Sequence, residues 1–375
     1  MDKAKQEDSG KSLLNIVLFL FFLYLFLVSI ELLGTSFKLF GKDFAETILS
    51  TTSNPLIGLF IGILATSMVQ SSSATTSIVV GMVAAPVNAL PLANAIPIVM
   101  GANIGTTVTN TIVSIGHITR PQEFRRAFAG ATVHDFFNLL SVAIFLPLEL
   151  TTHYLEHSAL FLQGLFANIG GIKILSPLKS IVKPMVHLIK DTIARVNPDD
   201  RFVASVCLVL SLTILFLSLT RLVSLMKKVI IGKIERLMHN YLFANALRSF
   251  ALGIAFTAIV QSSSVVTSLA VPLVGAGILS IEQIFPYTLG SNIGTTVTAL
   301  LASLVTQNPT AIATALVHLL FNISGTILWF PLRIVPITMA KKFGNLMAQR
   351  RILALLYVFI AFYGIPLLLA LLTRG

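Results

Sequence analysis

Two long stretches of this chain contain almost no charged side chains. Residues 54–119 include no Asp, Glu, Lys or Arg, and residues 249–332 include only Glu282. A membrane-spanning helix needs about 20 consecutive apolar residues, so each stretch has room for several spans. Charged residues make up 11% of the whole chain, against roughly 25% in soluble domains. The sequence therefore predicts an all-α polytopic membrane protein.

The formal net charge of +11 does not indicate nucleic-acid binding. The basic residues lie in short segments between apolar ones, and in membrane proteins such segments mark cytoplasmic loops. Cys207 is the only cysteine, so an intrachain disulfide and a cysteine metal site are both excluded. The apolar run over 12–33 is too long for the core of a signal peptide and predicts a retained first helix.

An internal repeat relates the two halves of the chain. Three pairs of similar segments occur in the same order, at offsets of 191, 189 and 184 residues. Chance does not produce such ordered matches, so the halves derive from a duplication. The paired segments are Gln-Ser-Ser-Ser at 70–73 and 261–264, Asn-Ile-Gly-Thr-Thr at 103–107 and 292–296, and a His-to-Asn segment at 134–138 and 318–322.

The two Gln-Ser-Ser-Ser segments lie within apolar stretches over 56–86 and 250–280, each longer than a single span requires. We expect each stretch to form a re-entrant hairpin with its tip at the polar residues. Three crossings, over 91–118, 126–148 and 203–224, then separate the hairpins. An odd number gives inverted repeats, and the placement of the basic loops agrees with this topology. The full prediction is seven crossings and two hairpins, with the N-terminus inside and the C-terminus outside.

The predicted organisation has six parts. The stretch 149–202 mixes both charges with prolines, and basic side chains recur in it at helical spacing among apolar ones. This pattern predicts an extracellular linker that contains an amphipathic surface helix. The parts are an N-terminal helix and loop (1–54), repeat 1 (55–148), the linker (149–202), a connecting helix and cytoplasmic loop (203–248), repeat 2 (249–332), and a basic loop with a C-terminal helix (333–375).

The hairpin tips form the predicted anion site. A polar break at membrane depth is tolerated only where it is buried in protein or lines a cavity, and broken helices in inverted repeats are typical of transporters. Serine hydroxyls and free amides at a helix N-terminus can bind phosphate without a lysine or arginine. Two tips that enter from opposite faces would converge on one anion. The candidate residues are Gln70, Ser71, Ser72, Ser73, Gln261, Ser262, Ser263 and Ser264.

The Asn-Ile-Gly-Thr-Thr segments indicate a cation site. Gly105 and Gly294 permit an unwound turn, and each repeat is expected to contain a broken transmembrane helix there. The freed carbonyls, with Asn and Thr oxygens, would suit a hard cation such as sodium. Asp135 lies within a predicted span, where a carboxylate is usually functional; its counterpart is Leu319, which indicates a cation site in one half only. The candidates are Asn103, Thr106, Thr107, Asn292, Thr296 and Asp135.

Structural roles compete with these interpretations. Ser and Thr in membrane helices often bond back to a helix carbonyl or join two helices. For a single Ser-Ser-Ser segment this explanation would serve equally well, but two copies at matching positions favour a site. His134 and His318 fit hydrogen-bonded core residues better than direct ligands.

These motifs resemble the type II sodium–phosphate cotransporter family, over about 56–149 and 252–331. The paired Gln-Ser-Ser-Ser segments, the segment 101–111 and the segment 123–138 carry the resemblance. It implies inverted repeats whose Gln-Ser-Ser-Ser regions line the substrate path. Animal members have a long disulfide-bonded loop where this chain has a short linker without cysteine. By resemblance, Ala129, Ala131 and Asp135 match a pattern of electrogenic members, and Asn138, Ser291 and Thr295 match positions assigned to sodium.

The combined prediction is sodium-coupled uptake of inorganic phosphate by alternating access, electrogenic, in the cell inner (plasma) membrane. The expected partners are phosphate, sodium and the lipid bilayer, without nucleic acid; a homodimer is left open. No cofactor is expected beyond the co-transported sodium ions. One alternative is a sodium-coupled symporter of a dicarboxylate or sulfate. Another is an intramembrane serine hydrolase that uses His134 and Asp135. The duplication and the lack of a Gly-x-Ser-x-Gly motif argue against an enzyme.

Overall fold

The computed structural model describes residues 2–40, 51–86, 89–168, 176–237 and 245–372. These residues form helices, and no strand occurs among them. Seven helical segments in this part of the chain are long and apolar enough to cross a membrane, which confirms the polytopic all-α prediction. They are Leu14–Phe40, Leu92–Ile115, Pro121–Thr152, Asp200–Leu222, Ile281–Thr306, Pro309–Trp329 and Arg351–Leu369.

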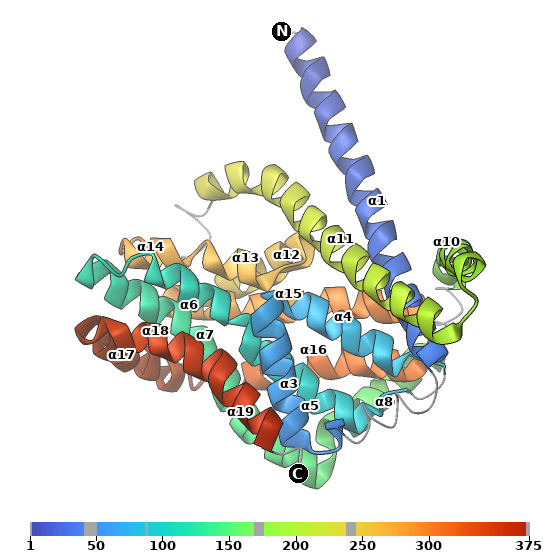
Figure 1. The fold of residues 1–375 in the computed structure, drawn as a ribbon. Coiled ribbons are helices and arrows are strands. Elements are labelled where there is room, and N and C mark those ends of the chain that lie inside the picture. The colour runs from blue at the N-terminus through green and yellow to red at the C-terminus, as the bar shows by residue number, and fades with distance from the viewer. Residues whose placement is uncertain (1, 41–50, 87–88, 169–175, 238–244, 373–375) are drawn as a thin grey trace.

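The helices of the two repeats pack into one bundle with the connecting and C-terminal helices around it, and the N-terminal helix extends away from it (Figure 1). The first half consists of α1 (Asp2–Phe40), α3 (Pro55–Val69), α4 (Ser72–Val83), α5 (Leu92–Thr106), α6 (Val108–Ile115) and α7 (Pro121–Thr152). The connection consists of α8 (Tyr154–Asn168), α10 (Ser176–Val196) and α11 (Asp200–Leu237). The second half consists of α12 (Ala246–Val260), α13 (Ser263–Ser268), α14 (Val271–Gly275), α15 (Ile281–Thr306) and α16 (Pro309–Trp329). The chain continues through α17 (Ile334–Gln349), α18 (Arg351–Phe359), the π-helical turn η2 (Ile360–Gly364) and α19 (Ile365–Leu372).

Both Gln-Ser-Ser-Ser segments interrupt a helix in the same way. Gln70 and Gln261 take the left-handed conformation, with φ of 55° and 60°, which a helix cannot continue through. The next residue, Ser71 or Ser262, is extended and caps the following helix. The Ser71 hydroxyl accepts from the Ala74 amide, as is usual for an N-cap serine. The sequence therefore predicted the position of each break correctly.

The returning arms of the two breaks differ in continuity. In the first half the arm is the single helix α4, whereas in the second half it is divided into α13 and α14. Pro272 lies in the first turn of α14. Proline has no amide hydrogen and its ring clashes with the carbonyl four residues earlier, so α13 ends at Ser268.

Glycines allow α3 to lie directly against α5, and α12 against α15. A Cβ on Gly101 would come 2.0 Å from the Leu59 carbonyl oxygen, and one on Gly290 would come 2.0 Å from that of Phe250. No side chain fits at such a distance, so these two positions require glycine. The same pairing of helices in both halves is the clearest structural trace of the repeat.

The predicted break at Gly294 is wrong, because α15 runs without interruption from Ile281 to Thr306. A Cβ on Gly294 would lie 2.7 Å from the Ile254 carbonyl oxygen, so this glycine serves close packing rather than unwinding. In the first half α5 ends and α6 begins around Thr107, which keeps helical dihedral angles of −77° and −15°. Gly105 itself lies inside α5 and also packs against α3.

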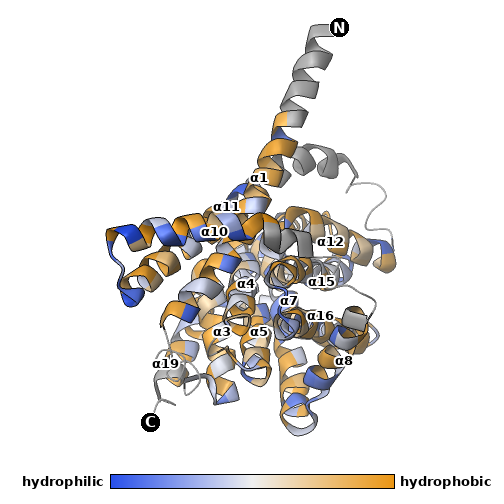
Figure 2. Ribbon diagram, turned by 90° about the vertical axis from the view of Figure 1, so that its right-hand side faces the viewer, coloured by the Kyte–Doolittle hydropathy of each residue, from blue (hydrophilic) through white to orange (hydrophobic). Residues whose placement is uncertain are grey.

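The connection between the halves contains the expected amphipathic helix. In α10, Val182 and Val186 are buried in the core that α1 and α11 share, whereas Lys183 and His187 are exposed. Figure 2 shows hydrophilic and hydrophobic residues alternating along α10. The preceding helix, α8, packs with the core of the bundle, because Leu155 belongs to the same buried cluster as residues of α5 and α16.

The basic segment after α16 forms a helix where the sequence predicted a loop. In α17 the buried residues recur every three or four positions, at Pro336, Ile337, Ala340, Gly344 and Met347. This spacing places them on one helical face, which lies along α7. The basic residues within and beside the segment concealed this pattern in the sequence.

Candidate functional site

A cavity of about 360 Å³ lies between the two helix breaks. Both tips contribute to it, so the structure brings together the two segments that the sequence predicted to converge. The wall opposite the tips comes from α11, which supplies Phe216, Leu219, Thr220 and Ser224. The tip residues that line the cavity are Val69, Gln70, Ser71, Gln261, Ser262 and Val265.

The remaining serines of the two segments lie behind this cavity. Ser72 and Ser263 are buried, and their backbone carbonyls accept from Thr76 and Thr267, in each case at 2.8 Å. The Ser73 hydroxyl donates to the Gln261 carbonyl oxygen at 3.3 Å. The first two bonds are local to α4 and α13, whereas the Ser73 bond links the first tip directly to the second.

The two glutamines have different surroundings. Gln261 is buried, and its side-chain oxygen accepts from Thr298 at 2.7 Å, whereas Gln70 is exposed. Thr109 is the counterpart of Thr298, and its hydroxyl has no partner among the described residues. The tips are thus related by sequence but are not equivalent in this conformation.

A chain of buried amides and one histidine connects the halves beneath the tips. Asn292 Nδ2 donates to Asn138 Oδ1 at 2.9 Å, and Asn138 Nδ2 donates to the Asn103 carbonyl oxygen at 2.7 Å. The side-chain oxygen of Asn292, Oδ1, lies 2.6 Å from His134 Nε2. Three predicted cation-site residues, from α5, α7 and α15, therefore meet in one network.

His134 has a fixed tautomer in this network. An amide oxygen can only accept, so His134 Nε2 donates to Asn292. An amide nitrogen can only donate, so His134 Nδ1 accepts from Asn110 Nδ2 at 3.4 Å. Asn110 Oδ1 in turn accepts from Thr267 of the second tip at 2.9 Å. His134 is therefore a hydrogen-bonded core residue, as expected, whereas neither ring nitrogen of His318 has a partner among the described residues.

Asp135 lies in a separate buried cluster. Its Oδ2 accepts from the Tyr357 hydroxyl at 2.8 Å and from Thr111 at 3.4 Å, whereas the Thr107 hydroxyl donates to the Ile104 carbonyl oxygen at 2.8 Å. Its Oδ1 is buried and has no partner in the described part of the chain. A carboxylate oxygen without a partner, among hydroxyl oxygens, is the donor set that a sodium ion would use.

The other predicted cation ligands do not join this cluster. Ser291 lies 2.7 Å from Thr257, and Thr295 donates to the Ser291 carbonyl oxygen at 2.9 Å. Thr106 and Thr296 bond back to carbonyls of their own helices. The structure thus places the nine candidates in three groups: the amide network, the Asp135 cluster, and hydroxyls that bond to their own helix or, for Ser291, to α12.

Sequence reasoning missed several residues of these clusters. Asn110 and Thr111 follow the repeated motif, but their counterparts in the second half are Ala299 and Leu300, so the repeat gave no signal for them. Tyr357 reaches Asp135 from α18, which carries no motif. Only the packing of α18 against α6 and α7 brings it to the site.

The helices and the polar cavity between their breaks define a class of protein: a polytopic α-helical membrane protein with broken helices around a polar site. Comparison with known sequences narrows the class. The family described as Na+/Pi-cotransporter matches residues 25–173 and 214–367. No solved structure matches the chain.

Curated relatives agree with the family match. The sodium-dependent phosphate transport protein 2B of Homo sapiens is 37% identical over 462 aligned residues, covering 97% of this chain and 67% of the relative. The sodium-dependent phosphate transport protein 2A of Ovis aries is 37% identical over 437 residues, covering 96% and 68%. This chain therefore belongs to the Na+/Pi-cotransporter family.

Proposed function

We propose that this protein takes up inorganic phosphate together with sodium across the plasma membrane. The observation that carries the proposal is the cavity between the two Gln-Ser-Ser-Ser breaks, which contains polar groups from both halves. Relatives that are named sodium-dependent phosphate transport proteins and align over nearly the whole chain support the same function.

The chemistry of the cavity favours coupling to a cation. Among the residues that the structure describes, its lining includes hydroxyls and side-chain amides but no Lys or Arg. The tip of α4 adds the partial positive charge of a helix N-terminus, which alone does not balance a multiply charged anion. A co-bound sodium ion supplies the missing charge, so anion and cation bind better together than either does alone.

The Asp135 cluster is the proposed site for one of these sodium ions. Its free Oδ1 and the surrounding hydroxyls offer oxygen ligands, and its counterpart in the second half is Leu319. A cation bound there adds one charge to each cycle. A single charge that crosses 100 mV releases about 2.3 kcal/mol, so electrogenic transport would gain energy from the membrane potential.

We propose alternating access about the tips as the mechanism. The amide network joins α5, α7 and α15 across the two halves, and the Ser73 bond joins the tips. Movement of one half against the other would open the cavity to one side and then to the other, as inverted repeats permit.

Substitution of a cavity serine tests the anion site. Ser71→Ala removes a hydroxyl from the cavity, and the loss of a hydrogen bond to a charged ligand costs about 1.5–3 kcal/mol. We expect the KM for phosphate to rise at least about tenfold. Asn245→Ala is the matched control, because Asn245 caps α12 in the same manner but does not line the cavity. An equal change of KM in the two variants would show that Ser71 serves only as a cap.

A further inference from the structure

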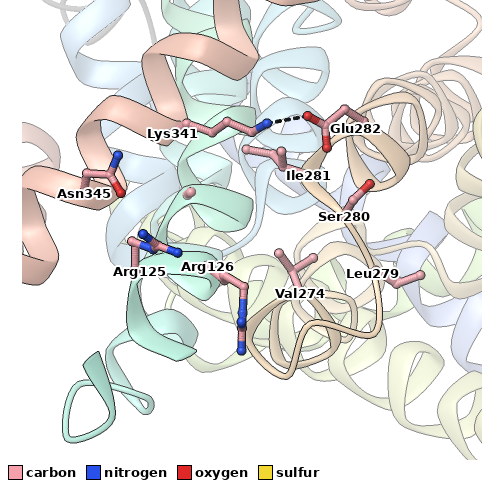
Figure 3. Close-up of a pocket in the computed structure, with 10 residues that line it drawn as sticks. Arg125, Arg126, Val274, Leu279, Ser280, Ile281, Glu282, Lys341 and Asn345 are labelled. Carbon is pink, nitrogen blue, oxygen red and sulfur yellow. Dashed lines mark hydrogen bonds and ion pairs between the residues drawn. The ribbon is translucent and has the colours of Figure 1, made fainter. Parts of the chain in front are cut away.

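A second cavity, also of about 360 Å³, lies away from the helix breaks and shares no lining residue with the first. It is formed by the start of α7, the turn between α14 and α15, and the middle of α17. Figure 3 shows Lys341 of α17 facing Glu282 of α15 across one end of the cavity, with Arg125 and Arg126 of α7 on another side. We call it the basic cavity.

The charges of the basic cavity are unbalanced. Three of its lining residues are basic and one is acidic. Glu282 is already paired, because Lys341 Nζ lies 2.5 Å from its Oε1. Neither Arg125 nor Arg126 has a carboxylate partner in the described part of the chain. Two arginine side chains that line the cavity are thus left without a carboxylate partner among the described residues.

The structure holds Arg126 in a defined position. Its Nε donates to the Gly275 carbonyl oxygen at 2.9 Å, and a Cβ on Gly277 would lie 3.4 Å from its Cζ. The turn after α14 therefore packs against the guanidinium group. The Nε bond uses one of the five N–H donors of arginine, and the terminal nitrogens stay available for an oxyanion.

The rest of the lining is apolar. Ala129, Val274, Leu279 and Ile281 line the cavity beside the arginines. A basic edge next to apolar surface between membrane helices is the arrangement that binds phosphate-bearing lipid headgroups.

We propose that the basic cavity binds a phosphate group through Arg125 and Arg126. The group has two possible sources with the same chemistry: the headgroup of an anionic phospholipid and free inorganic phosphate. The proposal does not rest on the transport function, since the cavity is separate from the helix breaks and its binding is measurable without sodium.

Thermal stability of the purified protein in detergent tests this proposal. The probes are short-chain phosphatidylglycerol, short-chain phosphatidylcholine as the neutral comparison, and inorganic phosphate, all in sodium-free potassium buffer. The wild type is compared with Arg125→Gln/Arg126→Gln. Lys342→Gln is the matched control, because Lys342 is an exposed cation of α17 that does not line the cavity.

We expect phosphatidylglycerol or inorganic phosphate to raise the Tm of the wild type. The double variant should require an at least about tenfold higher concentration of the same probe for the same rise in Tm. Lys342→Gln should behave as the wild type. A response to phosphatidylglycerol alone identifies a lipid, and a response to phosphate identifies the free anion. The proposal is overturned if neither probe acts, if phosphatidylcholine acts equally, or if the double variant keeps the wild-type affinity. If the double variant does not fold, Arg125→Gln answers the same question, because Arg125 is exposed.

Discussion

Close packing between α3 and α5 fixes the position of the first tip, and Gly62→Ala tests this directly. A Cβ on Gly62 would lie 2.1 Å from the Ile98 carbonyl oxygen and 2.9 Å from the Ala102 amide nitrogen. Both are backbone atoms, so no side chain can rotate away and the helices must separate. Overpacking of this kind typically lowers the free energy of unfolding by about 1–3 kcal/mol. Because the surrounding atoms belong to the backbone, we expect a loss at the upper end of this range.

Gly58→Ala provides the matched control on the same helix, one turn earlier. Its Cβ would lie 3.4 Å from Ile98 Cγ1, an ordinary contact, and alanine favours a helix over glycine by about 0.8–1.0 kcal/mol. We expect Gly62→Ala to lower the Tm in detergent by about 3–4 °C and Gly58→Ala to leave it unchanged or slightly raised.

The rate of phosphate uptake should fall in Gly62→Ala and stay near that of the wild type in Gly58→Ala. Because α3 ends at the Gln70 break, a displaced α3 moves the tip relative to the second tip, and Gly62→Ala should slow phosphate uptake. Equal Tm and equal uptake in the two variants would refute the idea that helix contact positions the tip.

Two further predictions concern the cation and the topology. Asp135→Gly should remove the proposed sodium site, so that phosphate uptake stops or continues with its phosphate-induced current close to zero; an unchanged ratio of charge to phosphate, from current and tracer uptake on one preparation, would make Asp135 structural. In a Cys207→Ala background, a cysteine at Gln122 should react with impermeant reagents from the cytoplasm and one at Asn197 from outside. Reaction of both from the same side would contradict the inverted arrangement of the repeats.

The helix breaks could be predicted from sequence because their signal is local. A polar Gln-Ser-Ser-Ser segment within a long apolar stretch already implies a tip, and the serine that follows the glutamine is a natural N-cap. The repeat then indicated that two tips meet. Ser73 and Gln261, which are far apart in the sequence, are in contact as this argument required.

The role of Gly294 could not be decided from sequence. Glycine permits both an unwound turn and close approach of two helices, and only the position of α12 shows that the second effect operates here. The same limit applies to Tyr357 and Asn110. Their partners, Asp135 and His134, belong to other helices, so the contacts depend on packing that no single segment specifies.

The most direct test of the account is uptake of radiolabelled phosphate into proteoliposomes that contain the purified protein. An inward sodium gradient should drive phosphate accumulation above its equilibrium level, whereas an equal potassium gradient should not. An excess of sulfate or a dicarboxylate should leave this uptake unchanged. Equal uptake under the sodium and potassium gradients would contradict sodium coupling, and full competition by sulfate or a dicarboxylate would contradict phosphate as the substrate.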